Sequence, residues 1–306
     1  MEATEKAAGR RAGLATLLRI AVSVALVAWI LRKTPVPQVL EAFRSADLRF
    51  VLLALALSPI GYWASVSRWR LLLRSQGGDA SFGFLLRSFL VGVFFNNLLP
   101  STIGGDAVRA VATSRAGLGR AAAVTVVFVD RFLGLLALML FAVAGVLVSG
   151  RITERVPALY TWVLAGALGL GLAAVFLKRI GRTFRGRGSV LARAFGLSLV
   201  LQVAVVLNYY FLAKALHVPI SLPDFFLIVP LSLFVMMVPV SINAIGVREN
   251  VLAFFFAAFG VASIQAVAVA WLDYGLVLLQ ALVGGAIYAW GRRPAPDVLP
   301  AEEAAR

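Results

Sequence analysis

The sequence predicts an all-α polytopic membrane protein, a helical bundle that contains two re-entrant or broken helix pairs. Hydrophobic residues make up 61% of the 306 residues and charged residues only 14%, a composition typical of integral membrane proteins. Long apolar runs alternate with short basic segments, and two of the apolar segments are interrupted by Pro and Gly. The chain has no cysteine and one histidine, which excludes disulfides, thiolate metal sites and a His-rich metal site. We therefore expect no water-soluble fold and no metal.

Six apolar runs are long enough to cross about 30 Å of hydrocarbon as an α-helix. They lie at about 13–31, 48–67, 121–149, 158–177, 190–213 and 263–290. Two further apolar segments, about 82–99 and 224–242, contain Pro or Gly and are followed by second pieces at about 104–116 and 247–260. We predict that each forms a broken helix pair; whether it re-enters or crosses fully stays open.

Basic residues indicate the orientation in the membrane. A cluster without acids at about 178–193 should face the cytoplasm, because cytoplasmic loops carry an excess of Lys and Arg. Counting the spans from there makes the tails, 1–12 and 291–306, cytoplasmic in a cell membrane, and places Arg68, Arg70 and Arg74 at the same side. The net charge of +15 then reflects loops at an anionic membrane surface, and we expect no nucleic acid partner.

The two halves of the predicted membrane domain, about 13–149 and 158–290, show the same order of segments. Each half contains three spans and one broken pair, so the second half enters the bilayer inverted relative to the first, as in many transporters. The breaks "LLPSTIGGDAVR" (98–109) and "MVPVSINAIGVRE" (237–249) share an apolar start, Pro, small polar residues, Ile-Gly and Arg. An aspartate follows about ten residues into each next long helix, at Asp130 and Asp273. The halves should superpose by a rotation of about 180°.

The broken segments are the candidate ligand site. Backbone groups freed by Pro and Gly, and charges inside a bilayer, are costly unless protein or a polar cavity satisfies them. We expect Arg109 and Arg248 in the first turns of half-helices, where free N–H groups and the helix dipole favour an anion such as phosphate. The alternative is a tight helical hairpin without a ligand. The predicted substrate-binding residues are Asn97, Ser101, Gly104, Gly105, Asp106, Arg109, Asp130, Arg131, Asn243, Gly246, Arg248 and Glu249.

Adjacent helical residues diverge by about 100°, so Asp130 and Arg131 need separate partners. We expect Asp130 to meet Arg109 or Arg248 while Arg131 reaches the cytoplasmic interface; alternatively both extend from one end of the span to the interface. Asp273 is expected near the outer interface, and the tyrosine pair at 209–210 in an interfacial aromatic belt. Interhelical hydrogen bonds are the expected role of Gln202, Asn208, Gln265 and Gln280.

Three motifs in order, "NNLLPSTIGGDAVRA" (96–110), "VFVDRFLGLLAL" (127–138) and "VPVSINAIGVREN" (238–250), give the chain a family resemblance. It resembles the flippase-like transmembrane region of lysylphosphatidylglycerol synthases and their stand-alone relatives, over about 13–290. The resemblance implies movement of a lipid or glycolipid precursor between leaflets. The motif positions that it marks are Asn97, Pro100, Gly104, Gly105, Asp106, Arg109, Asp130, Arg131, Pro239, Gly246, Arg248 and Glu249. The soluble aminoacyl-transfer domain of the synthases is not in this sequence, so the resemblance does not assign synthesis of an aminoacyl lipid to it.

We therefore expect a transporter-like protein, not an enzyme, that moves a lipid with an anionic headgroup. The alternatives are a membrane glycosyl- or acyltransferase that uses Asp106 or Asp130 as a base, and a non-catalytic partner of a lipid-synthesis enzyme. No cofactor is expected, and no P-loop motif is present, so an ion gradient through Asp130, Asp273 or Glu249 and passive movement both stay open.

Overall fold

The computed structural model describes residues 36–98, 103–148, 186–238, 241 and 244–290, with 166, 168, 169 and 171. These residues form helices and no strands. The helices are α2 (Val36–Arg44), α3 (Leu48–Ser75), α4 (Phe82–Leu98), α5 (Ile103–Arg115), α6 (Arg120–Val148), α9 (Gly188–Ala215), α10 (Leu222–Met236), α11 (Val247–Ala257) and α12 (Ser263–Trp290). The predicted spans at 13–31 and 158–177, both tails, Pro100, Ser101, Pro239 and Asn243 lie outside the described residues.

Four of the predicted spans are confirmed. The helices α3, α6, α9 and α12 are each 28 or 29 residues long and carry apolar windows suited to crossing a bilayer. At 1.5 Å per residue such a helix is about 42 Å long, more than the hydrocarbon core requires. The chain is therefore a multi-pass helical membrane protein, as its composition predicts.

Both predicted breaks separate two shorter helices, and beside each break a side chain accepts a hydrogen bond from a backbone N–H. In the first, the Asn96 side-chain oxygen accepts a 2.7 Å bond from the Gly105 N–H, which joins α4 to α5. The two helices approach closely at Gly92, where a Cβ would lie only 3.3 Å from the Gly105 carbonyl oxygen. In the second, Gly246 has φ +84°, which suits glycine, and its N–H donates to the Glu249 carboxylate at 2.8 Å.

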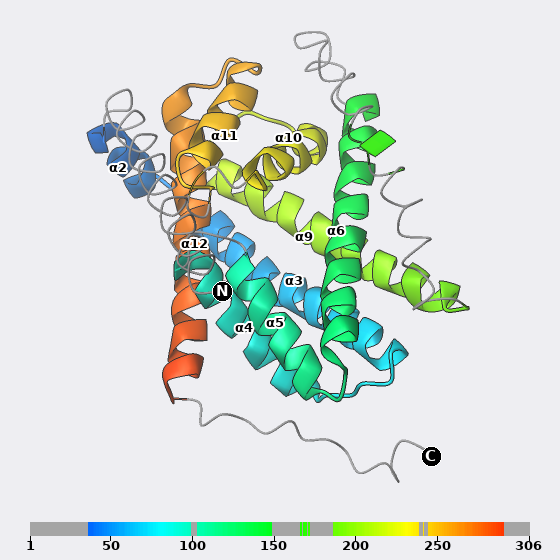
Figure 1. The fold of residues 1–306 in the computed structure, drawn as a ribbon. Helices are drawn as coiled ribbons and strands as arrows, with labels where there is room; N and C mark the ends of the chain where they lie inside the picture. Colours follow the sequence, from blue (N-terminus) through cyan, green and yellow to red (C-terminus); the bar gives the residue numbers. More distant parts are fainter. Residues whose placement is uncertain are drawn as a thin grey trace, which may run out of the picture.

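The two halves are arranged alike. In each, the first long described helix packs on the first helix of the broken pair and on the second long helix: α3 with α4 and α6, and α9 with α10 and α12. Each first short helix also crosses to the other half, α4 onto α12 and α10 onto α6. The colours of Figure 1 show that α6 and α12 run in opposite directions, and so do α3 and α9. This is the arrangement expected of an inverted repeat.

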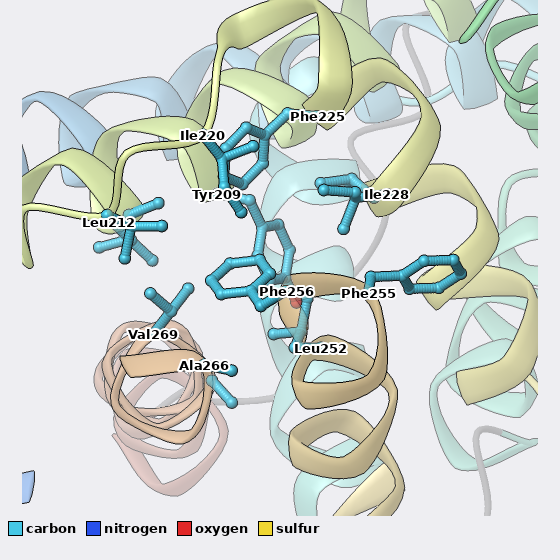
Figure 2. Close-up of a cluster of buried hydrophobic side chains, with 14 of the residues drawn as sticks. Tyr209, Leu212, Ile220, Phe225, Ile228, Leu252, Phe255, Phe256, Ala266 and Val269 are labelled. Atoms are coloured by element: carbon cyan, nitrogen blue, oxygen red, sulfur yellow. The ribbon is translucent and has the colours of Figure 1, made fainter. Parts of the chain in front are cut away.

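The apolar core lies between the helices in two clusters. One is centred on Trp69, Leu72 and Leu85 of the first half. The other joins α9, α10, α11 and α12, and Figure 2 shows its aromatic and aliphatic side chains meeting from several helices. Lipid-facing side chains such as Leu147 and Leu282 are exposed and apolar. Because lipid gives no hydrophobic driving force between helices, close packing and interhelical hydrogen bonds hold the bundle together.

Candidate functional site

The first polar centre is built around Asp130 of α6, which is fully buried. Arg68 of α3 donates through Nε to Oδ1 at 2.7 Å and through Nη2 to Oδ2 at 3.1 Å. Arg109 of α5 donates through Nη2 to Oδ2 at 2.8 Å. The remaining Arg68 Nη1 donates to Ser198 of α9 at 2.8 Å. Two guanidinium groups therefore share one carboxylate, which leaves a formal excess of one positive charge.

Arg109 is held in place by aromatic and hydroxyl groups. Its guanidinium lies 4.8 Å from the centre of the Trp69 ring, within range of a cation–π interaction. Trp69 Nε1 donates to the Thr113 hydroxyl at 2.9 Å, and this hydroxyl donates to the Arg109 carbonyl at 2.8 Å. The Arg109 Nε is buried and has no hydrogen-bond partner. An unpaired donor on a buried guanidinium is costly, because it lacks the hydrogen bond that it makes in water.

The second polar centre is built around Asp273 of α12. Arg248 of α11 donates to Oδ2 at 3.0 Å, and Tyr209 donates its hydroxyl to the same oxygen at 2.8 Å. The Asn208 amide donates to Oδ1 at 3.0 Å. The Arg248 Nε is buried without a hydrogen-bond partner, as in Arg109, and its guanidinium lies 5.4 Å from the Tyr274 ring.

The two centres occupy equivalent positions in the two halves. Asp130 and Asp273 each lie ten residues beyond the first residue of their helices, α6 and α12. Arg68 and Asn208 each lie twenty residues beyond the starts of α3 and α9. Equivalent side chains thus hold equivalent aspartates, but the first half uses a cation where the second uses a neutral amide.

A third ion pair joins Asp106 of α5 to Arg131 of α6. Arg131 Nη2 and Nε donate to the Asp106 Oδ1 at 2.6 and 2.9 Å. The pair is more exposed than the two centres, with 46% of the Arg131 side chain accessible. Asp130 and Arg131 therefore have separate partners, as their angular separation on the helix predicts.

A cavity of about 420 Å³ lies between the two halves and reaches both centres. It is lined by residues of α3, α4, α5, α6, α9, α10, α11 and α12. Its polar wall consists of Ser58, Tyr62, Ser65, Arg68, Asn96, Arg109, Arg131, Asn208, Tyr209, Arg248, Asp273 and Gln280. Apolar side chains such as Leu57, Phe89, Leu201 and Leu276 complete the wall. Four guanidinium groups and one carboxylate thus face this space.

The predicted site residues divide into four groups. Gly105, Arg109, Arg131 and Arg248 line the cavity, as the sequence suggested for a common site. Asp106, Asp130 and Glu249 lie behind it as partners of Arg131, Arg109 and the Gly246 N–H. The Asn97 amide donates to the Val93 carbonyl at 2.9 Å, and Gly104 is partly buried near the start of α5. Ser101 and Asn243 lie outside the described residues.

The structure corrects several positions. Arg68, expected at the cytoplasmic interface, is buried because Asp130 pairs with it inside the bundle. Asp273 and Tyr209, expected at interfaces, are buried together in the second centre. Arg131 binds Asp106 and lines the cavity.

Arg109 is the seventh residue of α5, beyond its first turn, whereas Arg248 is the second residue of α11. Only Arg248 is therefore close to free N–H groups of a helix start. The predicted interhelical role is confirmed for the four amides: Gln202, Asn208, Gln265 and Gln280 each donate to a residue of another segment.

Comparison with known proteins agrees with this architecture. Residues 16–187 and 175–284 match the lysylphosphatidylglycerol synthase TM region family. The chain belongs to this family. It is also similar to the UPF0104 membrane protein PH1989 of Pyrococcus horikoshii, with 25% identity over 327 residues, covering 90% of this chain and 97% of the relative. The family covers both polar centres and the cavity between them.

Proposed function

We propose that this protein moves a lipid with an anionic headgroup, a phospholipid or glycolipid precursor, between the leaflets of the cell membrane. The headgroup occupies the cavity between the two halves, and the tails stay in the bilayer. The observation that carries the proposal is the presence of two buried arginines, Arg109 and Arg248, that line one cavity and each keep an unpaired Nε donor. Phosphate oxygens are acceptors for such guanidinium groups.

The charge of the site favours an anion at the first centre. Arg68 and Arg109 together face only Asp130, while Arg131 is balanced by Asp106. In the second centre Arg248 is balanced by Asp273, and Glu249 lies next to it in sequence. The excess positive charge is therefore located around Arg109. A headgroup phosphate would bind there first and reach toward Arg248 across the cavity.

The distribution of basic residues supports an orientation in which the C-terminal end of α3 lies at the cytoplasmic side of the membrane. The end of α3, the ends of the first broken pair and the starts of α6 and α9 gather at the lower right of Figure 1. They carry the basic residues Arg70, Arg74, Arg87, Arg115, Arg120 and Arg193, with Asp79 as the acid between α3 and α4. At the other end, Arg44, Arg49 and Lys214 are balanced by Glu41, Asp47 and Asp224. We propose that the basic end contacts the anionic cytoplasmic leaflet.

Transport by the purified chain tests the proposal. The protein would be reconstituted into liposomes with fluorescent phosphatidylglycerol, and transbilayer movement followed by chemical quenching of the outer leaflet. We expect movement that protein-free liposomes lack and that is weaker for a zwitterionic phospholipid. Transport by the chain alone argues against a non-catalytic subunit, and an unchanged lipid argues against a transferase. Absence of movement under conditions where the protein is folded would contradict the proposal.

Arg109→Ala is the sharpest variant because it leaves no carboxylate unpaired. Asp130 keeps both of its bonds to Arg68, so the fold should survive while the free Nε donor is lost. We expect transport to fall at least tenfold, and Arg109→Lys to restore only part of it, because an ammonium lacks the planar fork that suits phosphate. Arg115→Ala, an exposed arginine at the end of the same helix, is the matched control.

Arg248→Ala needs a compensating change. It would leave Asp273 with only the Tyr209 and Asn208 donors, so Arg248→Ala combined with Asp273→Asn separates loss of the anion site from loss of stability. The corresponding pair Arg109→Ala with Asp130→Asn would not be a rescue, because Arg68 would remain buried without a carboxylate. Full transport by folded Arg109→Ala would refute headgroup binding at the first centre.

A further inference from the structure

The two halves repeat each other's helix contacts except at one junction. The second long helix of the first half, α6, packs along α9 of the second half. In an inverted repeat α12 corresponds to α6 and α3 to α9, so α12 is expected to pack along α3. Among the described helices, the backbones of α3 and α12 hardly approach each other. Every other packed pair among the helices α3 to α12 has a corresponding pair in the repeat. In the part of the chain that the structure describes, one junction of the cavity wall is therefore closed by packed helices and its counterpart is not.

The unpacked junction is bridged by side chains. Gln280 of α12 donates to the Ser58 hydroxyl of α3 at 2.7 Å, and Tyr62 of α3 donates to the Gln280 side-chain oxygen. All three residues line the cavity. We refer to Ser58, Tyr62 and Gln280 as the α3–α12 seam.

Equivalent positions of the closed junction have other partners. Ser198 and Gln202 lie ten and fourteen residues beyond the start of α9, as Ser58 and Tyr62 do in α3. Ser198 accepts from Arg68, and the Gln202 amide donates to the Gly134 carbonyl at 3.4 Å. At the closed junction Gln202 thus bonds to the packed helix α6, whereas Tyr62 at the equivalent position bonds to α12 across the seam; Ser198 bonds to α3 instead.

The outer side of the α3–α12 seam is apolar. Ile60 and Trp63 of α3 are 46% and 53% exposed, and Leu279 and Val283 of α12 are 51% and 49% exposed. Successive residues of an α-helix are about 100° apart, so Ile60 lies about 200° from Ser58 around α3. None of the four apolar residues lines the cavity, unlike the seam residues. In a membrane protein the surroundings of such apolar side chains are lipid acyl chains.

We propose that the α3–α12 seam is the lateral portal through which a membrane lipid passes its headgroup into the cavity. The proposal rests on the proposed transport of lipid and adds its route. The headgroup crosses between α3 and α12 at Ser58, Tyr62 and Gln280, while the acyl chains stay against Ile60, Trp63, Leu279 and Val283. Hydrogen bonds within membranes contribute about 0.6 kcal/mol each on average, so opening two of them is easier than separating packed helices.

A crosslink across the seam tests the portal. The chain has no cysteine, so Ser58→Cys with Gln280→Cys can be joined by a short, reducible bifunctional thiol reagent. We expect the crosslink to abolish both transport and photolabelling by a photoactivatable phosphatidylglycerol, and a reductant to restore both. Transport of the double variant before crosslinking is the reference, and each single cysteine variant treated with the reagent shows the effect of one modified thiol alone. The pair Gln202→Cys with Gly134→Cys spans the closed junction; its crosslink should leave photolabelling intact.

A second variant avoids the reagent. Ser58→Trp places a large side chain inside the seam and should reduce transport at least tenfold, whereas Leu52→Trp, at an exposed apolar position of the same helix outside the seam, should leave it near the unmodified level. Transport that persists in the crosslinked pair, or in folded Ser58→Trp, would overturn the portal. If Arg109→Ala still abolishes transport in that assay, the proposed function stands and only the route is wrong.

Discussion

The two polar centres share the same arrangement of helices but differ in their charged side chains. Asp130 and Asp273 lie at equivalent places in α6 and α12, but Asp130 binds two arginines whereas Asp273 binds one arginine, a tyrosine and an asparagine. The difference arises at one repeat position, which is Arg68 in the first half and Asn208 in the second. An inverted repeat can therefore keep its architecture while its two halves acquire different electrostatic roles. In this protein the first half holds the excess cation.

The largest expected effect is on stability. Asp130→Asn leaves two buried arginines without a carboxylate and should lower the free energy of unfolding by about 3–5 kcal/mol. Asp273→Asn deprives one arginine of its partner and should cost about 1–3 kcal/mol. Denaturant titration of both variants in the same detergent measures the difference. Equal losses would mean that the second arginine adds nothing at the first centre.

Exchanging the residues at the repeat position should exchange the behaviour of the centres. Arg68→Asn gives the first centre the neutral amide of the second and removes the excess positive charge, while Asp130 keeps Arg109. Loss of about 1–2 kcal/mol of anion binding would weaken headgroup binding roughly 5- to 30-fold. Asn208→Arg in the same chain adds a cation beside Asp273 and should recover part of the loss. Binding of fluorescent phosphatidylglycerol in detergent, with Arg70→Asn as the control, gives the result.

A smaller effect is expected from Tyr209, which donates to the aspartate only in the second centre. Tyr209→Phe removes the hydroxyl that donates to Asp273 and should reduce stability by about 1 kcal/mol, within the range for hydrogen bonds inside membranes. Trp69→Phe, at the equivalent position of α3, removes a bond to Thr113 and not to the aspartate, so it should leave the charge pattern of its centre unchanged. A change in anionic lipid selectivity for Trp69→Phe larger than that for Tyr209→Phe would contradict this assignment.

The smallest effect belongs to an ion pair outside the membrane. The hydrogen bond from Arg74 holds the pKa of Asp79 below its usual range, with further help from the Ala80 N–H. The ionised form therefore stabilises the folded state above pH about 4 and this contribution is lost as pH falls through the lowered pKa. Because both side chains are substantially exposed, Asp79→Asn should cost only a few tenths of a kcal/mol at neutral pH. Unfolding of the variant and parent at pH 7 and pH 3 measures it; equal differences at both values would refute the pair.

Much of the fold was predictable because the bilayer imposes simple rules on a sequence. Long apolar runs must be helices, and the four described runs that met the length requirement are α3, α6, α9 and α12. Pro and Gly marked the breaks, and the positions of the helix ends at α4, α5, α10 and α11 follow them within a few residues. The Ile-Gly-Arg breaks and the aspartates in the next helices indicated a repeat, which the helix pairings support.

The partners of the charges required the tertiary structure. The sequence suggests that Arg68 is interfacial because it precedes Arg70 and Arg74 at the end of a span. Its side chain nevertheless points to another side of α3 and donates to Asp130, 62 residues later. Tyr209 reads as part of an aromatic belt for a similar reason. A single sequence shows the spacing along each helix, but not the crossing that brings α3 against α6 and α9.

By itself, therefore, the sequence determined the class of the protein, its helices, its breaks and the residues with unusual charge, because these depend on local composition and on the bilayer. Only the tertiary structure decided that Arg109 shares a carboxylate with Arg68, that both centres face one cavity, and that the α3–α12 seam lacks the packing of its counterpart. The physical reason is that these features are contacts between distant helices, set by how side chains fit across a crossing. The repeat gives both halves the same helices, and a few side chains at the crossings make them different.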